Sequence, residues 1–150
     1  HDRLADIGGS LVVRALADAQ AGQLQAIKQP EVGITYAHKI EKAEALVNWQ
    51  ESADVIGRRV RAFNPFPAAC TQWGTDVIKL WRATVETTTH HQAAGTVLSA
   101  DAHGVRVACG NGVLCVNELQ RAGGKRLNAA EFLRGFPLAV GQRFETHTAN

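Results

Sequence analysis

Cationic side chains occur in three groups along the chain, and their spacing indicates contact with a polyanion. The first group is a loop in which two glycines stand between the cations, Arg121-Ala122-Gly123-Gly124-Lys125-Arg126. Adjacent glycines allow the backbone to come close to a phosphate group, and the neighbouring cations neutralise its charge. We therefore predict that Arg121, Lys125 and Arg126 contact phosphate groups.

The second group lies on a predicted helix over residues 53–63. The apolar residues of this segment fall on one side, and Arg58, Arg59 and Arg61 lie largely off that stripe. Guanidinium groups stay charged and form paired hydrogen bonds with phosphate oxygens. A row of solvated arginines on a helix surface would have the same pattern, so both interpretations stay open.

The third group, Lys79 and Arg82, belongs to a predicted strand. Side chains alternate between the two faces of a strand, so these two cations should point in opposite directions. At most one of them would then share a face with the glycine loop. Trp73 and Trp81 lie in the same region and could stack on bases, but so few aromatic residues are present that we expect both in the core.

Histidine and cysteine residues supply no convincing catalytic or metal site. His90 and His91 are adjacent in a threonine-rich stretch, whereas a tetrahedral metal site needs three or four converging ligands. Cys109 and Cys115 flank a predicted turn and could face each other across a hairpin, but we expect two buried thiols. No phosphate-binding loop, dinucleotide-binding glycine pattern or Ser/His/Asp arrangement is recognisable. We predict no catalytic and no metal-binding residue.

Composition describes a small globular protein with one core. The chain has 150 residues, of which 45% are hydrophobic, and this favours one domain with a modest appendage. Residues 1–49 hold five basic and six acidic side chains, whereas residues 50–150 hold eleven and eight. No apolar run is long enough to span a membrane, and no signal peptide is apparent, so we expect a soluble cytoplasmic protein. The absence of methionine suggests a part of a longer protein.

Hydrophobic spacing predicts two helices before a β-rich region. Residues 3–21 have helical spacing, with Asp2 as the cap and Gly22 at the end, and residues 22–48 resemble a linker. Ser52 should cap the helix over 53–63, and Asn128 with Glu131 should cap a short helix that ends at Gly135. The expected strands are 69–73, 77–85, 96–100, 105–109, 113–120 and 143–146.

These elements predict a mainly β fold with flanking helices. The expected architecture is an OB-like β-barrel preceded by an N-terminal helix and a linker. Tight turns should occur at Gly74-Thr75 and Asn111-Gly112, because such residues tolerate the backbone of short hairpins. Trp49, Phe63 and Phe66 should anchor the second helix and its proline turn on the barrel.

Several segments resemble the bacterial methionyl-tRNA formyltransferases. The most specific is Val60-Arg61-Ala62-Phe63-Asn64-Pro65-Phe66-Pro67-Ala68-Ala69. Other similar segments follow the order of the family: Thr35-Tyr36-Ala37-His38-Lys39-Ile40, Trp49, Lys79-Leu80-Trp81-Arg82-Ala83, Gly95-Thr96-Val97-Leu98 and Leu119-Gln120 with the glycine loop. The resemblance covers nearly the whole chain. It implies that residues 1–21 are the last helix of a formyltransferase domain, 22–48 a linker and 49–150 an OB-like tRNA-binding domain.

The resemblance also implies a function. The family transfers a formyl group from 10-formyltetrahydrofolate to methionine on initiator tRNA, with catalytic Asn, His and Asp in an N-terminal domain that this sequence does not match. The chain would bind tRNA and its own upstream domain, hold no cofactor and be inactive alone. The cations that would contact tRNA are Arg121, Lys125, Arg126, Arg58, Arg59, Arg61, Lys79 and Arg82. Alternatives are an accessory barrel of a small-molecule formyltransferase or formyl hydrolase, and a domain that only packs against its catalytic partner.

Overall fold

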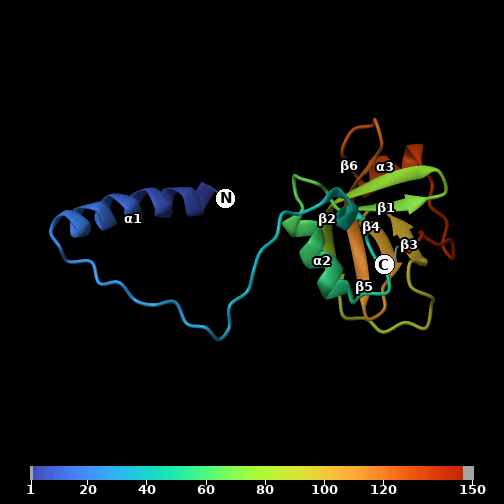
Figure 1. Ribbon diagram of the computed structural model, residues 1–150. Coiled ribbons are helices and arrows are strands. Elements are labelled where there is room, and N and C mark those ends of the chain that lie inside the picture. Colours follow the sequence, from blue (N-terminus) through green and yellow to red (C-terminus); the bar gives the residue numbers. More distant parts are fainter. Residues whose placement is uncertain (1, 147–150) are drawn as a thin grey trace. The chain divides into compact units, whose positions relative to one another are not determined.

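The computed structural model describes residues 2–146 (Figure 1). The chain forms two compact units, and their boundary in the sequence lies between His38 and Lys39. The first unit contains helix α1 (Asp2–Gln20), which runs through Gly8 and Gly9 without a break. Gly22 ends this helix with a φ of 68°, and its N–H donates to the Ala19 carbonyl at 3.0 Å. The predicted first helix and its glycine stop are confirmed. No α1 side chain that the structure describes is buried.

The second unit is built on an antiparallel sheet of six strands. Their order is β1-β2-β5-β4-β3, and the short β6 pairs with β5. The bounds are β1 Cys70–Trp73, β2 Asp76–Glu86, β3 Val97–Asp101, β4 Gly104–Ala108, β5 Val113–Arg121 and β6 Leu127–Asn128. The first five expected strands are confirmed, and β6 was not predicted.

Three helical segments accompany this sheet. They are the 3-10 turn η1 (Lys42–Ala45), α2 (Ala53–Ala62) and α3 (Ala129–Gly135). The Ser52 hydroxyl accepts from the Val55 N–H at 3.4 Å, and the Asn128 side chain accepts from the Glu131 N–H at 2.9 Å. Both predicted N-caps are therefore confirmed. Figure 1 shows α2 and α3 against different parts of the sheet.

The segment 143–145 reaches both edges of the sheet but forms no strand. Glu145 bridges Gln72 of β1, and Arg143 bridges Thr96 directly before β3. The Phe144 N–H donates to the Gly95 carbonyl at 3.0 Å. The expected strand over 143–146 is wrong, because the segment divides its hydrogen bonds between two edges. Residues 147–150 of the predicted domain lie outside the described part of the chain.

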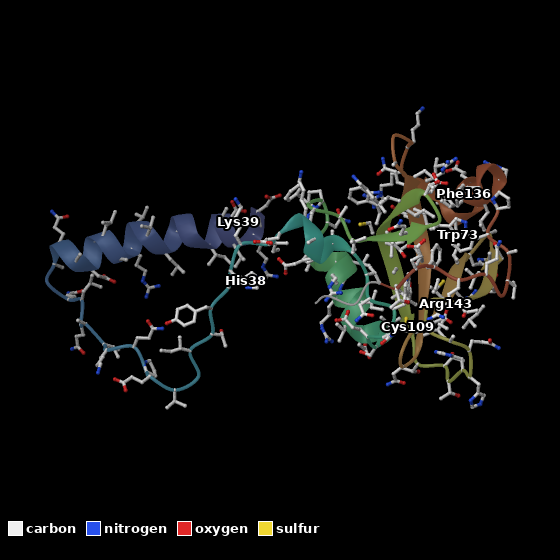
Figure 2. All side chains as sticks on the ribbon, turned by 45° about the vertical axis from the view of Figure 1, so that its right-hand side comes forward. His38, Lys39, Trp73, Cys109, Phe136 and Arg143 are labelled. Atoms are coloured by element: carbon white, nitrogen blue, oxygen red, sulfur yellow. The ribbon has the colours of Figure 1, made fainter. Side chains whose placement is uncertain are left out.

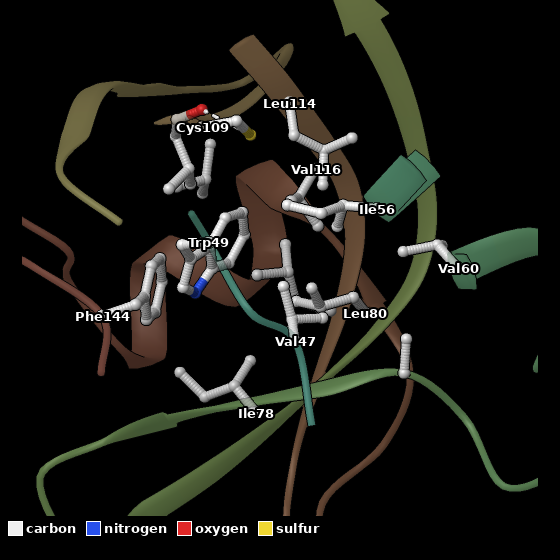
Figure 3. Close-up of a cluster of buried hydrophobic side chains, with 14 of the residues drawn as sticks. Val47, Trp49, Ile56, Val60, Ile78, Leu80, Cys109, Leu114, Val116 and Phe144 are labelled. Atoms are coloured by element: carbon white, nitrogen blue, oxygen red, sulfur yellow. Dashed lines mark hydrogen bonds between the residues drawn. The ribbon is translucent and has the colours of Figure 1, made fainter. Parts of the chain in front are cut away.

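Trp49 occupies the centre of the hydrophobic core (Figure 3). Its indole N–H donates to the Thr71 hydroxyl at 2.9 Å, which satisfies the buried polar end of the ring. Phe144 stacks on Trp49 with ring centroids 5.6 Å apart, and Trp73 meets Phe144 edge to face at 4.9 Å. Trp49 and Trp73 therefore pack with the core as predicted.

Only one of the two phenylalanines that were expected to anchor the proline turn after α2 is buried. Phe63 is buried, but Phe66 is 68% exposed, so the prediction for Phe66 is wrong. The Ala68 N–H donates to the Phe63 carbonyl at 2.9 Å, and this bond closes a loop whose tip carries Phe66 away from the core. Asn64 lies in the same loop and has a different role, described below.

Cys109 and Cys115 are buried free thiols, as expected. They do not face each other, because Cys115 is paired with Arg106 and the ladder ends at Ala108 and Val113. Burial raises the pKa of the Cys109 thiol to about 12. This thiol is therefore protonated in the folded protein at neutral pH.

Gly110 offers a test of the contact between the Asn-Gly turn and the segment that carries Trp49. A Cβ at this position would overlap the carbonyl oxygen of Gln50, which is backbone and has little freedom to move. We expect Gly110→Ala to lower the free energy of unfolding by about 1–3 kcal/mol in urea titration. Gly135→Ala is the control, because its Cβ would enter open space. Equal stability of the two variants would contradict this packing.

The Cys109 thiol supplies a second test. Because an ordinary thiol ionises near pH 8.5, iodoacetamide at that pH should alkylate Cys109 in the urea-unfolded chain and leave it unmodified in the folded chain. Mass spectrometry of the digested protein measures the difference. The raised pKa also means that the unfolded chain loses this proton first, so the free energy of unfolding should fall as pH rises from about 8.5 towards 12. Equal alkylation in both states would refute the burial.

Candidate nucleic-acid interface

A β-bulge at Trp81 arranges the cations of β2. Leu80 pairs with Leu119, but the next paired residue, Arg82, meets Glu118, and Trp81 falls between these pairs as an extra residue. An extra residue reverses the alternation of side chains beyond it. Lys79 and Trp81 alternate with the core residues Ile78 and Leu80 and so lie on the outer face, and the reversal places Arg82 on the same face. The prediction that Lys79 and Arg82 point to opposite faces is wrong for this reason.

Trp81 is fixed at the surface by two hydrogen bonds. Its indole N–H donates to the Gln120 side-chain oxygen at 2.8 Å, and its carbonyl accepts from the Asn64 side chain at 3.2 Å. Asn64 belongs to the proline turn after α2, so this turn holds the bulge of β2 in place. The expectation that Trp81 packs in the core is wrong, because Trp81 follows the inward-pointing Leu80 and its indole therefore lies on the outer face.

Cations surround the Trp81 ring. The Lys79 ammonium lies 5.8 Å and the Arg126 guanidinium 5.1 Å from the ring centroid, both within cation–π range. An open hollow of about 360 Å³ lies beside the ring. Its lining residues are Arg61, Asn64, Trp81, Arg82, Ala83 and Arg126. We call this hollow, together with Lys79, the Trp81 face.

Glu118 joins two arginines of the Trp81 face. One carboxylate oxygen lies 3.2 Å from Arg82 Nε, and the other accepts from Arg126. The Glu118 side chain is 20% exposed, against 64% for Arg82 and 46% for Arg126. The less exposed carboxylate therefore holds both guanidinium groups, and much of each arginine side chain stays open to solvent. Since four cations oppose this one carboxylate, the face keeps an excess of positive charge.

The glycine loop divides its cations between two places. Gly123 has a φ of 73°, and the Gly124 N–H donates to the Arg121 carbonyl at 3.0 Å, which makes a tight turn. The Gln120 side chain donates to the Gly124 carbonyl at 2.7 Å and so ties this turn to Trp81. Arg126 joins the Trp81 face, whereas Arg121 and Lys125 line a second hollow of about 200 Å³.

The arginines of α2 also separate. Arg59 is partly buried and forms two hydrogen bonds with Glu51, at 2.7 and 3.2 Å. Such a pair fixes the start of α2 and reduces the part of Arg59 that a ligand could reach. Arg58 and Arg61 are exposed, and Arg61 lines the Trp81 face. The structure thus brings together Arg61, Arg82, Arg126 and Lys79, from elements distant in sequence.

Four residues of this region were missed in the sequence: Asn64, Glu118, Gln120 and Phe136. A signal for the bulge was nevertheless present. The apolar residues Ile78 and Leu80 keep a spacing of two, but Ala83, which packs against the core, follows Leu80 by three. An odd step between inward residues of one strand indicates an inserted residue.

Comparison with known proteins identifies the domain. Residues 39–137 match the family model described as "Formyl transferase, C-terminal domain". The methionyl-tRNA formyltransferase of Delftia acidovorans is 57% identical over 143 residues, which are 94% of this chain and 44% of that protein. The corresponding protein of Acidovorax ebreus is 56% identical, with 94% and 45% covered. This chain spans less than half the length of these relatives.

Solved structures support the fold alone. HypX from Aquifex aeolicus in complex with tetrahydrofolic acid is similar with a TM-score of 0.61 and 19% identity, over 91% of this chain and 26% of that one. A HypX variant has a TM-score of 0.61 and 20% identity, over 87% and 23%. The family match covers most of the second unit and includes Asn64, Trp81 and the glycine loop. The chain therefore belongs to the formyl transferase C-terminal domain family, and its curated relatives are methionyl-tRNA formyltransferases.

Proposed function

We propose that this chain is the tRNA-holding, C-terminal part of a methionyl-tRNA formyltransferase. The whole enzyme would transfer a formyl group from 10-formyltetrahydrofolate to the amino group of methionine on initiator tRNA in the cytoplasm. The observation that carries the proposal is the Trp81 face, where Arg61, Arg82, Arg126 and Lys79 surround one fixed indole. The identity to methionyl-tRNA formyltransferases supports the choice of ligand.

The chemistry of the Trp81 face suits a nucleic-acid backbone. Arginine forks match the geometry of phosphate oxygens, and cations that displace condensed counterions supply most of the affinity for a polyanion. Contacts of this kind fix the position and orientation of the ligand without reading its sequence. The domain would thus orient tRNA so that its aminoacylated end reaches a catalytic site elsewhere, which raises the rate without local chemistry.

The other predicted contacts lie around this face. Arg58 is exposed on α2, and Arg121 and Lys125 lie on the other side of the glycine loop. We include these three as outer contacts of a long tRNA ligand. Arg59 would act mainly through its pair with Glu51, which holds the start of α2 in place.

We also infer an OB-like barrel and an upstream domain. The bridges of Glu145 to β1 and of Arg143 beside β3 support a barrel closed at single points. The exposed apolar side chains of α1, among them Leu4, Ile7 and Leu11, support the assignment of residues 1–21 to a formyltransferase domain. The catalytic residues and the folate site would belong to that domain. Among the residues that the structure describes, no helix could span a membrane.

The charge of the Trp81 face can be tested by titration with initiator tRNA. Arg82→Ala with Arg126→Ala removes two cations, each contributing about 1 kcal/mol at about 4 Å in water, so the affinity at 50 mM salt should fall about thirtyfold. The dependence of log K on log salt should also become less steep, by roughly one unit for each phosphate that is no longer neutralised.

Arg14→Ala on α1 is the charge control and should leave the affinity unchanged. The alternative function as an accessory domain for a small molecule predicts that neither wild type nor any variant binds tRNA. Thermal unfolding of each variant checks that the fold is kept.

Glu118 provides the opposite test. Glu118→Gln keeps the size of the side chain but removes a carboxylate that competes with phosphate for Arg82 and Arg126. We expect this variant to bind tRNA about fivefold more tightly at 50 mM salt, since about 1 kcal/mol of competing attraction is removed. Glu31→Gln changes the net charge equally, but its partner is Lys28, which is not among the proposed contacts, so this control should leave the affinity unchanged. Weaker binding by Glu118→Gln would mean that this carboxylate does not compete with the ligand.

A further inference from the structure

We propose that the second hollow, beside the glycine loop, binds a single unpaired nucleobase of the tRNA. This inference rests on the proposed function and gives it a second kind of contact. We call the hollow the Phe136 hollow. It is lined by Leu127, Phe132, Phe136, Arg121, Lys125, Glu131 and two glycines. Figure 2 shows Phe136 beside α3.

Arg121 brings its planar guanidinium group over the Phe136 ring in the Phe136 hollow. Its guanidinium carbon lies 4.7 Å from the centre of the Phe136 ring, and one of its nitrogens lies 2.7 Å from an Asp76 oxygen. The ring and the carboxylate hold the guanidinium in one orientation, yet the side chain remains 47% exposed. Phe132 contacts the Phe136 ring, with ring centroids 5.5 Å apart, and supports it in turn.

An unpaired base can complete this arrangement. Unstacked bases of RNA loops and bulges bind on aromatic rings and on the planes of arginine guanidinium groups. A base on the outer surface of Arg121 would form the third layer of a stack with Phe136 below. Because Asp76 already fixes Arg121, little conformational freedom is lost when the base binds.

The other lining residues favour a base inside the hollow and a phosphate at its rim. Glu131 brings a carboxylate to the wall, and this charge repels a phosphate but accepts hydrogen bonds from the N–H groups of a base. Lys125 is exposed and can neutralise the phosphate that follows the base. The volume of about 200 Å³ is below the 300–1,000 Å³ of sites for drug-sized molecules, which suits one ring system.

Two RNA hairpins test the proposal with this chain. They are identical except that one carries a single bulged 2-aminopurine, whose fluorescence falls when the base stacks. We expect quenching of the bulged probe and tighter binding of the bulged hairpin, by about five- to a hundredfold. Arg121→Lys keeps the charge but removes the planar guanidinium group, so the quenching and the preference for the bulge should disappear. Arg134→Lys, at an exposed position of α3 outside the lining of the hollow, should behave as wild type.

The outcomes separate this proposal from the function on which it rests. Equal binding of the two hairpins by wild type, or an unchanged preference in Arg121→Lys, would overturn the base site and leave the Trp81 face intact. Unchanged affinity of Arg82→Ala with Arg126→Ala for the plain hairpin would overturn the Trp81 face, while persistent quenching of the bulged probe would still support the base site. Absence of binding to both hairpins would overturn both.

Discussion

The β-bulge at Trp81 is the feature on which the arrangement of the proposed interface depends. In a regular β2, a residue two positions beyond Leu80 would point into the core with it, and Arg82 occupies that position. A buried guanidinium without a partner would be strongly destabilising. The bulge places Arg82 on the outer face, opposite Glu118. Ala83 is then the next residue of β2 that packs against the core. The same insertion brings Arg82 to the outer face, on which Trp81 and Lys79 already lie.

The bulge needs support from outside its own strand, and the sequence supplies it from two sides. Asn64 donates to the Trp81 carbonyl, and Gln120 accepts from its indole. Unpaired backbone groups at a bulge otherwise depend on water. The proline turn that carries Asn64 therefore has a structural task at the interface, although Phe66 at its tip contacts little of the core. The proline turn thus contributes to the interface through the hydrogen bond of Asn64, although the turn itself carries no cation.

Much of the fold could be predicted because local chemistry agrees with the tertiary structure. Ser52 and Asn128 cap helices in the way that their side chains allow, and Gly22 ends α1 with a positive φ. The errors at Trp81, Arg82 and Phe66 have a different origin. The alternation of side chains along strands and the burial of aromatic residues are average tendencies of regular strands and ordinary cores. Neither tendency takes account of an inserted residue or of a loop that is closed by the Ala68 N–H. The predicted contacts of the eight cations with tRNA stay predictions.

Counter-charges determine what the cations can offer a ligand. Glu118 holds Arg82 and Arg126, Asp76 holds Arg121, and Glu51 holds Arg59. Each pair fixes an arginine and weakens its field, so a ligand must compete for the charge but does not have to order the side chain. The balance differs among them because Arg82 is far more exposed than Arg59, at 64% against 25%. A phosphate can reach Arg82 without breaking its ion pair with Glu118, whereas Arg59 would have to leave Glu51 before it could bind a phosphate. The exposure of each arginine, and not its place in a basic run, therefore decides which of them can take part in binding.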